Sequence, residues 1–177
     1  MIPRGMYERL LCTCRTDPAT DDVAFARAIF DWMPEHLCVD RSRIFAMGFS
    51  NGGAMVFRLQ CEFSEILRAI SVTGMRLVRD WAPGAEACSP TRRIPIVGFC
   101  GDQDSICEGS TAGGLSQDEL MELTARDQGC TTPRVETLTT GSSTCVAQAG
   151  CGDLGTDTIE FCSIRGLGHT WPGSSCW

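Results

Sequence analysis

The chain of 177 residues has no lysine, a single tyrosine and two histidines. Without lysine, a Schiff-base mechanism or a lysine nucleophile is excluded. The 15 positive charges are therefore all arginine and stand against 22 acidic residues, which leaves a net charge of −7. Because phosphate binding requires a basic face, we expect no nucleic-acid partner. No apolar run is long enough to span a bilayer, so we expect no membrane span.

Paired C-x-x-C spacings, the usual mark of a zinc site, are also missing, although the chain has 12 cysteines. With only two histidines to add ligands, we expect no metal and no cofactor. Disulfides formed in an oxidising compartment explain the cysteines better. The alternatives are buried free thiols and, least favoured, a metal-binding cysteine protein. We therefore expect an extracellular protein, whose disulfide connectivity the spacing does not determine.

The N-terminal residues lack the apolar core of a signal peptide. Residues 1–15 carry three arginines and one short apolar spot, Leu10-Leu11. The cysteines thus indicate export, while the N-terminus gives no export signal. We expect a chain that has lost its natural N-terminus, because that would remove the conflict.

The order of periodic segments is typical of one α/β domain with a mainly parallel sheet and flanking helices. We expect residues 1–20 to be irregular and residues 21–177 to form one partial, truncated domain. Asp21 and Asp22 cap a predicted helix that runs to about His36, with apolar residues at helical spacing at Val23, Ala26, Ile29, Phe30 and Met33. The other expected elements are strands over 43–49, 69–72, 94–100, 135–138 and 158–164, a helix from the first strand to about residue 62, and a helix opened by a capping box at 116–119 and ending at Gly129. A turn over 39–42, a polar loop over 101–114 and a Gly/Ser/Cys-rich excursion between the last two strands complete the expectation.

The most informative motif follows the first predicted strand. Residues 48–52 read Gly-Phe-Ser-Asn-Gly, which has the form G-x-S-x-G between a buried strand and a helix. On such a turn the serine is forced into a strained backbone conformation that exposes its hydroxyl. Glycine is expected at 48 and 52 because side chains there would collide across the turn. The motif is typical of the nucleophile turn of an α/β-hydrolase core. Ser50 is therefore the predicted nucleophile, and the motif indicates ester chemistry.

A serine nucleophile on this fold needs a carboxylate and a histidine base that follow it in the order Ser, Asp or Glu, His. His36 ends a helix before the serine, where a helix C-terminus favours an imidazolium, and we expect a structural role for it. His169 lies in a glycine-rich loop directly after strand 158–164, where the base belongs. The alternative for His169 is a surface histidine in a turn.

The acid should follow the 94–100 strand, where Asp102 and Asp104 are both available. Asp102 is close enough to the strand end to cap the turn. We therefore favour Asp104 as the acid and keep Asp102 as the alternative. Glu108 and Asp118 are expected to be solvated.

The oxyanion hole is the incomplete part of the pattern. One donor is expected to be the backbone N–H of Asn51, directly after the nucleophile. The second normally comes from a loop after an earlier strand, and the sequence before residue 21 contains no such strand and loop. Loss of one donor costs on the order of a hundredfold in rate.

Taken together, these motifs resemble the secreted polyhydroxybutyrate depolymerase and feruloyl esterase family of α/β-hydrolases, over residues 21–173. Residues 21–25 resemble the opening of its helix before the nucleophile, and residues 39–44 and 48–55 resemble its nucleophile segment closely. Residues 101–104 resemble its H-G-x-x-D acid motif, with Cys100 where histidine is usual, and residues 168–173 resemble its G-H-T-W-P-G base motif.

The resemblance implies that Ser50 is the nucleophile, Asp104 the acid and His169 the base. It implies that Trp171 lines the acyl or aromatic side of the pocket, with ordinary packing as the alternative. It also implies that some of the cysteines at 130, 145, 151 and 162 form disulfides that tie down the histidine loop. Because family members begin with further strands and continue past the base motif, the chain resembles the middle and later part of an esterase.

The implied function is a serine carboxylic-ester hydrolase. Its expected substrates are hydroxyalkanoate polyesters or the feruloyl and acetyl esters of plant polysaccharide. The alternative is a catalytically inactive, cysteine-rich secreted binding derivative of such an esterase, which the missing oxyanion loop favours.

Overall fold

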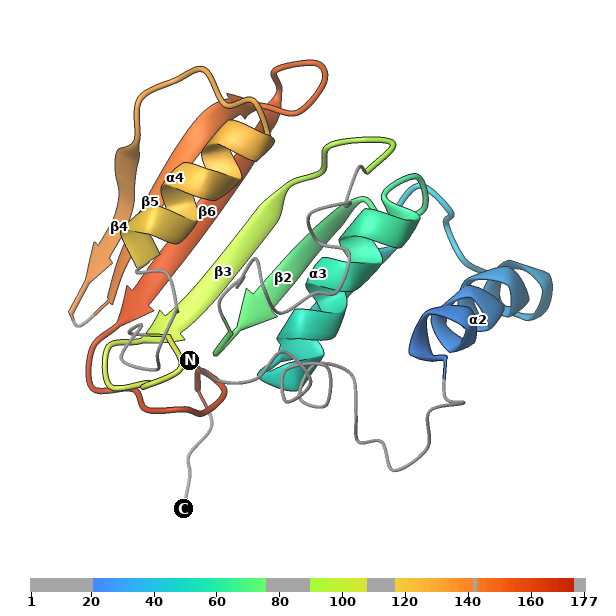
Figure 1. Ribbon diagram of the computed structural model, residues 1–177, viewed down its shortest axis with the longest axis horizontal. Helices are drawn as coiled ribbons and strands as arrows, with labels where there is room; N and C mark the ends of the chain where they lie inside the picture. The colour runs from blue at the N-terminus through green and yellow to red at the C-terminus, as the bar shows by residue number, and fades with distance from the viewer. Residues whose placement is uncertain (1–20, 76–89, 108–116, 142, 174–177) are drawn as a thin grey trace, which may run out of the picture.

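The computed structural model describes residues 21–75, 90–107, 117–141 and 143–173. Within these residues a six-stranded sheet has the order β1-β2-β3-β6-β5-β4 (Figure 1). The elements are, in chain order, α2 (Asp22–His36), β1 (Phe45–Phe49), α3 (Asn51–Phe63), β2 (Ala69–Thr73), β3 (Ile96–Gly101), α4 (Gln117–Asp127), β4 (Val135–Thr140), β5 (Ser143–Cys151) and β6 (Asp157–Ile164). The N-terminal segment 1–20, Glu108 and the first residue of the predicted capping box lie outside the described residues.

The sheet has a parallel part and an antiparallel part. Strands β1, β2, β3 and β6 pair in parallel, and β5 and β4 extend the sheet by antiparallel pairing. The expected α/β fold with a mainly parallel sheet and flanking helices is confirmed. Because neighbouring strands of the parallel part run the same way, their carboxyl ends meet at one edge of the sheet (Figure 1). That edge is where loops from distant parts of the sequence come together.

Strand β5 corrects the sequence analysis, which assigned residues between the last two expected strands to an irregular excursion. Their glycines, serines and cysteines have little intrinsic preference for a strand. In the structure, alternate residues Cys145 and Ala147 are buried, and β5 pairs with β6 along most of its length. Pairing and burial against distant residues therefore decide this segment, and local propensity does not.

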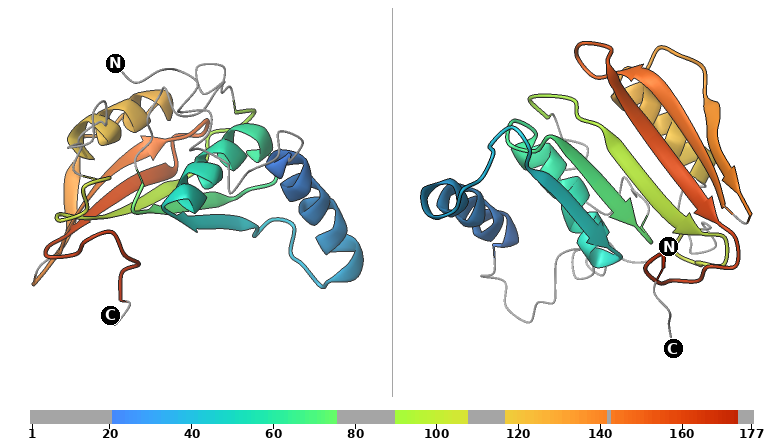
Figure 2. Two further views of the ribbon diagram at one scale, coloured as in Figure 1. Left: turned by 60° about the horizontal axis from the view of Figure 1, so that its bottom comes forward. Right: turned by 180° about the vertical axis from the view of Figure 1, so that it is seen from behind.

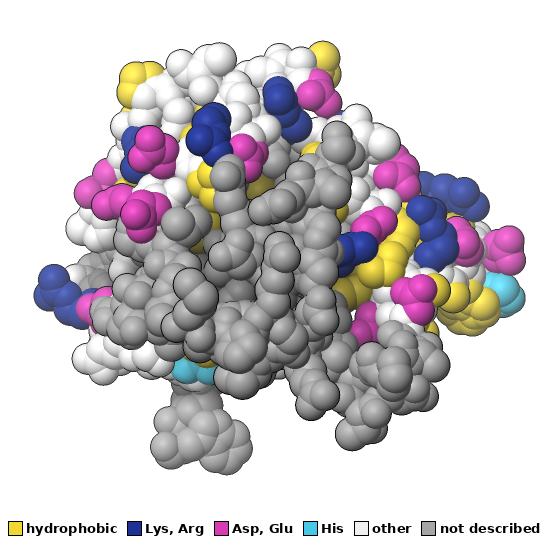
Figure 3. Space-filling model, in the orientation of Figure 1, with side chains coloured by type: hydrophobic (Ala, Val, Ile, Leu, Met, Phe, Trp, Pro, Cys, Tyr) yellow, Lys and Arg dark blue, Asp and Glu magenta, His cyan; other side chains and the backbone are white. Residues whose placement is uncertain are grey.

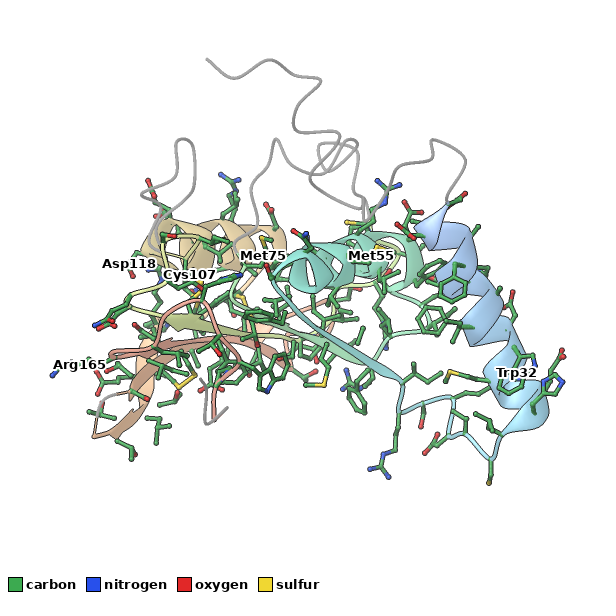
Figure 4. The ribbon with its side chains drawn as sticks, turned by 90° about the horizontal axis from the view of Figure 1, so that it is seen from below. Trp32, Met55, Met75, Cys107, Asp118 and Arg165 are labelled. Carbon is green, nitrogen blue, oxygen red and sulfur yellow. A yellow bond between two sulfur atoms is a disulfide. The ribbon has the colours of Figure 1, made fainter. Side chains whose placement is uncertain are left out.

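Helices α3 and α4 cover the same face of the sheet (Figure 4). Apolar residues meet on that face because Ile70, Ile96 and Ile159 are register partners across β2, β3 and β6, and all three are buried. In the next row Gly98 lies beside Phe161, and a Cβ at Gly98 would meet the Phe161 ring at 2.4 Å. A glycine in the middle of a strand is thus required by the ring that fills its place.

Helix α2 packs more loosely than the periodicity predicts. Asp21 caps it as expected, since its carboxylate accepts a hydrogen bond from the N–H of Ala24 at 2.9 Å. Phe30 contacts Phe63 of α3 edge to face, with ring centroids 5.3 Å apart. Ile29, predicted to belong to the buried face, is 40% exposed because α2 contacts the domain along one side. The half-buried residues of that side include Val23, Ala26 and Phe30.

An exposed apolar surface lies where α2 and β1 border the described structure. Figure 2 shows that α2 lies beyond the β1 side of the sheet. Figure 3 shows hydrophobic side chains in the region of α2. Trp32 on α2 is 50% exposed, and Phe45 and Met47 on β1 are 60% and 65% exposed. In the described part of the chain β1 pairs with β2 alone, so it is an edge strand there. None of the described helices has the length and apolar character needed to cross a membrane.

The predicted turn before β1 is held by Asp40. Its carboxylate accepts hydrogen bonds from the hydroxyl of Ser42 at 2.6 Å and from the Ser42 N–H at 2.9 Å. These two bonds, the hydroxyl's first, hold the pKa of Asp40 below its ordinary value. The turn thus delivers the chain into β1 and toward the G-x-S-x-G motif.

Candidate active site

The G-x-S-x-G segment forms a strained turn between β1 and α3. Ser50 has φ 54° and ψ −123°, and it is the single non-glycine residue with positive φ in the described part of the chain. Its N–H donates to the carbonyl of Thr73 at 2.9 Å, and its carbonyl accepts from the N–H of Ala54 at 3.2 Å. The expected strained conformation of Ser50 is therefore confirmed. Such strain is kept where the neighbouring strand and helix hold the backbone in place.

The two glycines that flank Ser50 differ in whether the structure requires glycine at their position. A Cβ at Gly48 would lie 2.2 Å from the carbonyl oxygen of Gly52, so only glycine fits there. A Cβ at Gly52 would meet nothing within 4 Å among the described atoms. The predicted collision is thus confirmed at Gly48 and wrong at Gly52, because Gly52 lies in the first turn of α3 and directs its Cβ position outward.

Three side chains from three strand ends form one hydrogen-bonded chain. His169 Nε2 lies 2.8 Å from Ser50 Oγ, and His169 Nδ1 lies 2.8 Å from Asp104 Oδ2. Ser50 follows β1, Asp104 follows β3, and His169 follows β6. The structure therefore brings together the three residues that the sequence analysis selected, although His169 is 119 residues from Ser50 and 65 residues from Asp104 in the sequence.

The surroundings of Asp104 fix how the imidazole can act. Asp104 is 1% exposed, and its other oxygen, Oδ1, accepts a hydrogen bond from the N–H of Ile106 at 2.9 Å. An ionised carboxylate only accepts hydrogen bonds, so it selects the tautomer of His169 that carries its proton on Nδ1. Nε2 is then the acceptor that faces the hydroxyl of Ser50. His169 Nε2 can therefore take the proton of the Ser50 hydroxyl while the serine oxygen attacks a substrate.

Asp102, the alternative acid, occupies a different place. Its Oδ1 accepts from the N–H of Gly166 at 2.6 Å, and its own N–H donates to the carbonyl of Ile164 at 3.0 Å. The N–H of Gln103 donates to the carbonyl of Leu167 at 3.1 Å. These three bonds join the loop of Asp104 to the loop of His169. Asp102 thus holds two loops together, while the imidazole bonds to Asp104.

Replacing Asp102 by alanine is expected to lower kcat for an ester substrate about tenfold, because a small displacement between acid and base loops misaligns the hydrogen-bonded chain. Asp102→Asn is the matched control, since its amide oxygen can still accept from the N–H of Gly166. Steady-state kinetics of both variants check this. Equal losses in the two variants would mean that charge, and not the bond to Gly166, is what Asp102 supplies.

Two aromatic rings lie beside this chain. The ring of Phe49 lies 4.8 Å from the imidazole of His169 and 6.2 Å from the ring of Trp171, measured between centroids. Trp171 is 40% exposed. Phe49 was not selected from the sequence, although its position directly before the nucleophile was the available signal. The rings form an aromatic surface next to Ser50.

The remaining selected residues fall outside the hydrogen-bonded chain. His36 ends α2, where its Nδ1 lies 2.9 Å from the carbonyl oxygen of Trp32 and its ring stacks on that indole. Asn51 is the first residue of α3, so its N–H has no acceptor within the helix. The side chain of Asp118 is 97% exposed, as expected for a solvated group.

Disulfides account for most cysteines of the described part. Disulfide bonds join Cys100 to Cys107, Cys130 to Cys151 and Cys145 to Cys162, and Cys61 is also disulfide-bonded. Cys38 is free and exposed. Cys145 and Cys162 lie with Glu160 in a group of metal-binding residue types, but their sulfurs are joined and offer no thiolate. Disulfides among cysteines 130, 145, 151 and 162 were expected and are confirmed, but neither bond lies in the loop of His169 that they were expected to tie down.

Known proteins with related sequences are esterases by name. Feruloyl esterase B of Piromyces equi is 30% identical over 168 residues, which is 88% of this chain and 30% of that protein. Feruloyl esterase D of Neurospora crassa is 27% identical over 133 residues, which is 74% of this chain and 42% of that protein. The chain is thus similar in sequence to proteins named feruloyl esterase. It spans less than half the length of either of these curated relatives, and no family model matches it.

A solved structure supports the fold independently. The acetyl xylan esterase from Aspergillus awamori superposes with a TM-score of 0.58 at 16% sequence identity. The match covers 84% of this chain and 62% of that one. At this identity the likeness shows the fold alone, which is the sheet with flanking helices described above.

Proposed function

We propose that the protein is a serine carboxylic-ester hydrolase that uses Ser50 as nucleophile, His169 as base and Asp104 as acid. The observation that carries the proposal is the continuous hydrogen-bonded chain from Ser50 Oγ through the imidazole to a buried carboxylate. The strained backbone of Ser50 adds support, because a hydroxyl presented in this way is accessible to a substrate. Similarity to proteins named feruloyl esterase supports the same reaction class.

In the proposed acylation step, Ser50 Oγ attacks the ester carbonyl carbon while His169 Nε2 takes the hydroxyl proton. The carbonyl oxygen becomes an oxyanion, which the N–H of Asn51, without an acceptor inside α3, can bind. The imidazolium that forms is stabilised by the Asp104 carboxylate, 2.8 Å from Nδ1. When the carbon–oxygen bond breaks, the proton on Nε2 passes to the leaving alcohol, and an acyl-serine remains.

Deacylation repeats these roles with water. His169 takes a proton from the water that attacks the acyl-serine, and it returns this proton to Ser50 Oγ as the acid leaves. The same imidazole thus serves as base and acid in both halves of the reaction. Its orientation must be constant through the cycle, which the bond from Nδ1 to Asp104 provides.

The substrate class that we propose is feruloyl or acetyl esters of plant polysaccharide, with hydroxyalkanoate polyesters as the wider alternative. Phe49 and Trp171 favour an aromatic acyl group, because their rings lie beside the hydrogen-bonded chain and Trp171 is half exposed. The names of the curated relatives support feruloyl esters. We further propose that residues 21–177 form part of a single esterase domain, secreted into an oxidising compartment where its disulfides persist.

The direct test is hydrolysis of p-nitrophenyl butyrate and methyl ferulate by the full chain beside its Ser50→Ala variant. We expect Ser50-dependent hydrolysis, with a loss of about 10⁴-fold or more in the variant. Ser50→Ala keeps a Cβ at the same strained position, so the fold is preserved. Folded parent protein that binds feruloylated polysaccharide but hydrolyses neither ester would instead identify the inactive binding derivative.

A further inference from the structure

The Asp104 loop is closed by a disulfide of its own. Cys100 lies on β3 and Cys107 follows the loop, so the bond joins residues seven positions apart with Asp104 between them. Cys107 is 3% exposed, and Figure 4 shows it beneath α4. Cys100 is register partner of Ser163 on β6, the strand that leads to His169. The disulfide therefore ties the loop to the strand pair from which both acid and base emerge.

Hydrogen bonds inside the loop pass this constraint to the carboxylate. The N–H of Asp104 donates to the carbonyl of Gly101 at 3.2 Å, and the N–H of Cys107 donates to the carbonyl of Asp104 at 2.9 Å. The N–H of Ile106, the residue before Cys107, donates to Asp104 Oδ1 at 2.9 Å. With Oδ1 engaged there, Oδ2 is directed at His169 Nδ1. The residue that orients the carboxylate is thus bonded directly to the cysteine that the disulfide fixes.

We propose that the Cys100–Cys107 disulfide is a positioning element that sets the orientation of the Asp104 carboxylate toward His169. The proposal rests on the proposed function, since it assigns the disulfide to the acid of that triad. The disulfide closes the loop of Asp104, so it acts through that residue. Without the disulfide, the six residues between Cys100 and Cys107 would sample many more backbone conformations. In most of these conformations Asp104 Oδ2 would no longer be aligned with His169 Nδ1.

The other two disulfides with known partners have different places in the fold. Cys130–Cys151 joins the chain after α4 to the end of β5, and Cys145–Cys162 joins β5 to β6 across register partners. Neither closes a loop that carries Ser50, Asp104 or His169. Cys130–Cys151 is therefore a matched control, because its removal tests the loss of a disulfide without release of the acid loop.

The experiment compares the full-length variants Cys100→Ala/Cys107→Ala and Cys130→Ala/Cys151→Ala with the parent. We expect the first to lose kcat roughly 10- to 100-fold with KM for p-nitrophenyl butyrate nearly unchanged, because alignment is lost and substrate contacts are not. We expect the control to keep the parent kcat per folded molecule. An unchanged kcat in the first variant, or an equal loss in the control, would overturn the proposal.

A spectroscopic measurement separates this inference from the esterase proposal. The proton between His169 Nδ1 and Asp104 should give a low-field, slowly exchanging NMR signal. His36 is the other histidine, so a signal that remains in the His36→Gln variant is assigned to His169. This signal should weaken in Cys100→Ala/Cys107→Ala and persist in the control, even in a parent without esterase activity. A signal unchanged in the first variant counts against positioning.

If the alanine pair does not fold, the parent itself provides the test. Partial reduction by a thiol, followed by alkylation and peptide mapping, gives the fraction of each disulfide that is open at each time. Loss of kcat should follow the opening of Cys100–Cys107 and not that of Cys130–Cys151. Activity that survives full opening of Cys100–Cys107 would overturn the proposal.

Discussion

Replacing Asp104 by asparagine is expected to lower kcat about 10⁴-fold while the fold is retained. The contacts of Asp104 determine which way the new amide points. The N–H of Ile106 donates to Oδ1, so the amide oxygen must stay there and the NH₂ group must take the place of Oδ2, facing His169 Nδ1. The NH₂ group can only donate, so Nδ1 must accept and the proton moves to Nε2. An imidazole in that tautomer has no acceptor for the proton of Ser50.

The comparison that isolates this effect is Asp102→Asn, two residues away on the same loop. Asp102 accepts from the N–H of Gly166 through one oxygen, and an amide oxygen serves equally as acceptor. We expect its kcat to stay within about threefold of the parent, as for most substitutions that preserve packing and bonding. Steady-state kinetics, with circular dichroism to verify folding, measure both. Equal loss in the two variants would make the general negative charge of the loop responsible and contradict the tautomer argument.

The positions of the three selected side chains could be predicted from sequence for a reason that the sheet supplies. Each follows a strand, and the parallel strands of one sheet deliver their carboxyl ends to one edge. Local patterns were therefore enough to select Ser50 by its turn, His169 by its glycine-rich loop and Asp104 by its strand. Asp104 was also preferred to Asp102 because Asp102 is nearer to the end of the strand, where it was expected to cap the turn.

Features that depend on contacts between distant residues could not be predicted in this way. Strand β5 forms because it pairs with β6, and its own composition favours no strand. The pairing of Cys100 with Cys107 required the loop geometry, since spacing alone permits many connectivities. The exposure of Ile29 likewise depends on how α2 meets its neighbours, which periodicity does not report.

The pair Gly48→Ala and Gly52→Ala provides the sharpest test of the turn that presents Ser50. Both positions are glycine in the G-x-S-x-G motif, yet the structure gives them opposite tolerances. At Gly48 a Cβ would lie 2.2 Å from a backbone oxygen, which no side-chain rotation can relieve. We expect Gly48→Ala to lower the free energy of unfolding by about 3 kcal/mol, the upper range for steric overpacking. The strand must shift to relieve the overlap, and Ser50 shifts with it.

At Gly52 a Cβ meets no described atom, and the residue is helical. We expect Gly52→Ala to change the free energy of unfolding by no more than about 1 kcal/mol, and to raise it if helix propensity decides. Urea unfolding measures both variants, and the rate of labelling by a fluorophosphonate reports the placement of Ser50. Labelling should be slowed in Gly48→Ala and preserved in Gly52→Ala. If Gly48→Ala matches the parent in both measurements, the close approach of β1 to the first turn of α3 is not what shapes the turn, and the strain at Ser50 must have another source.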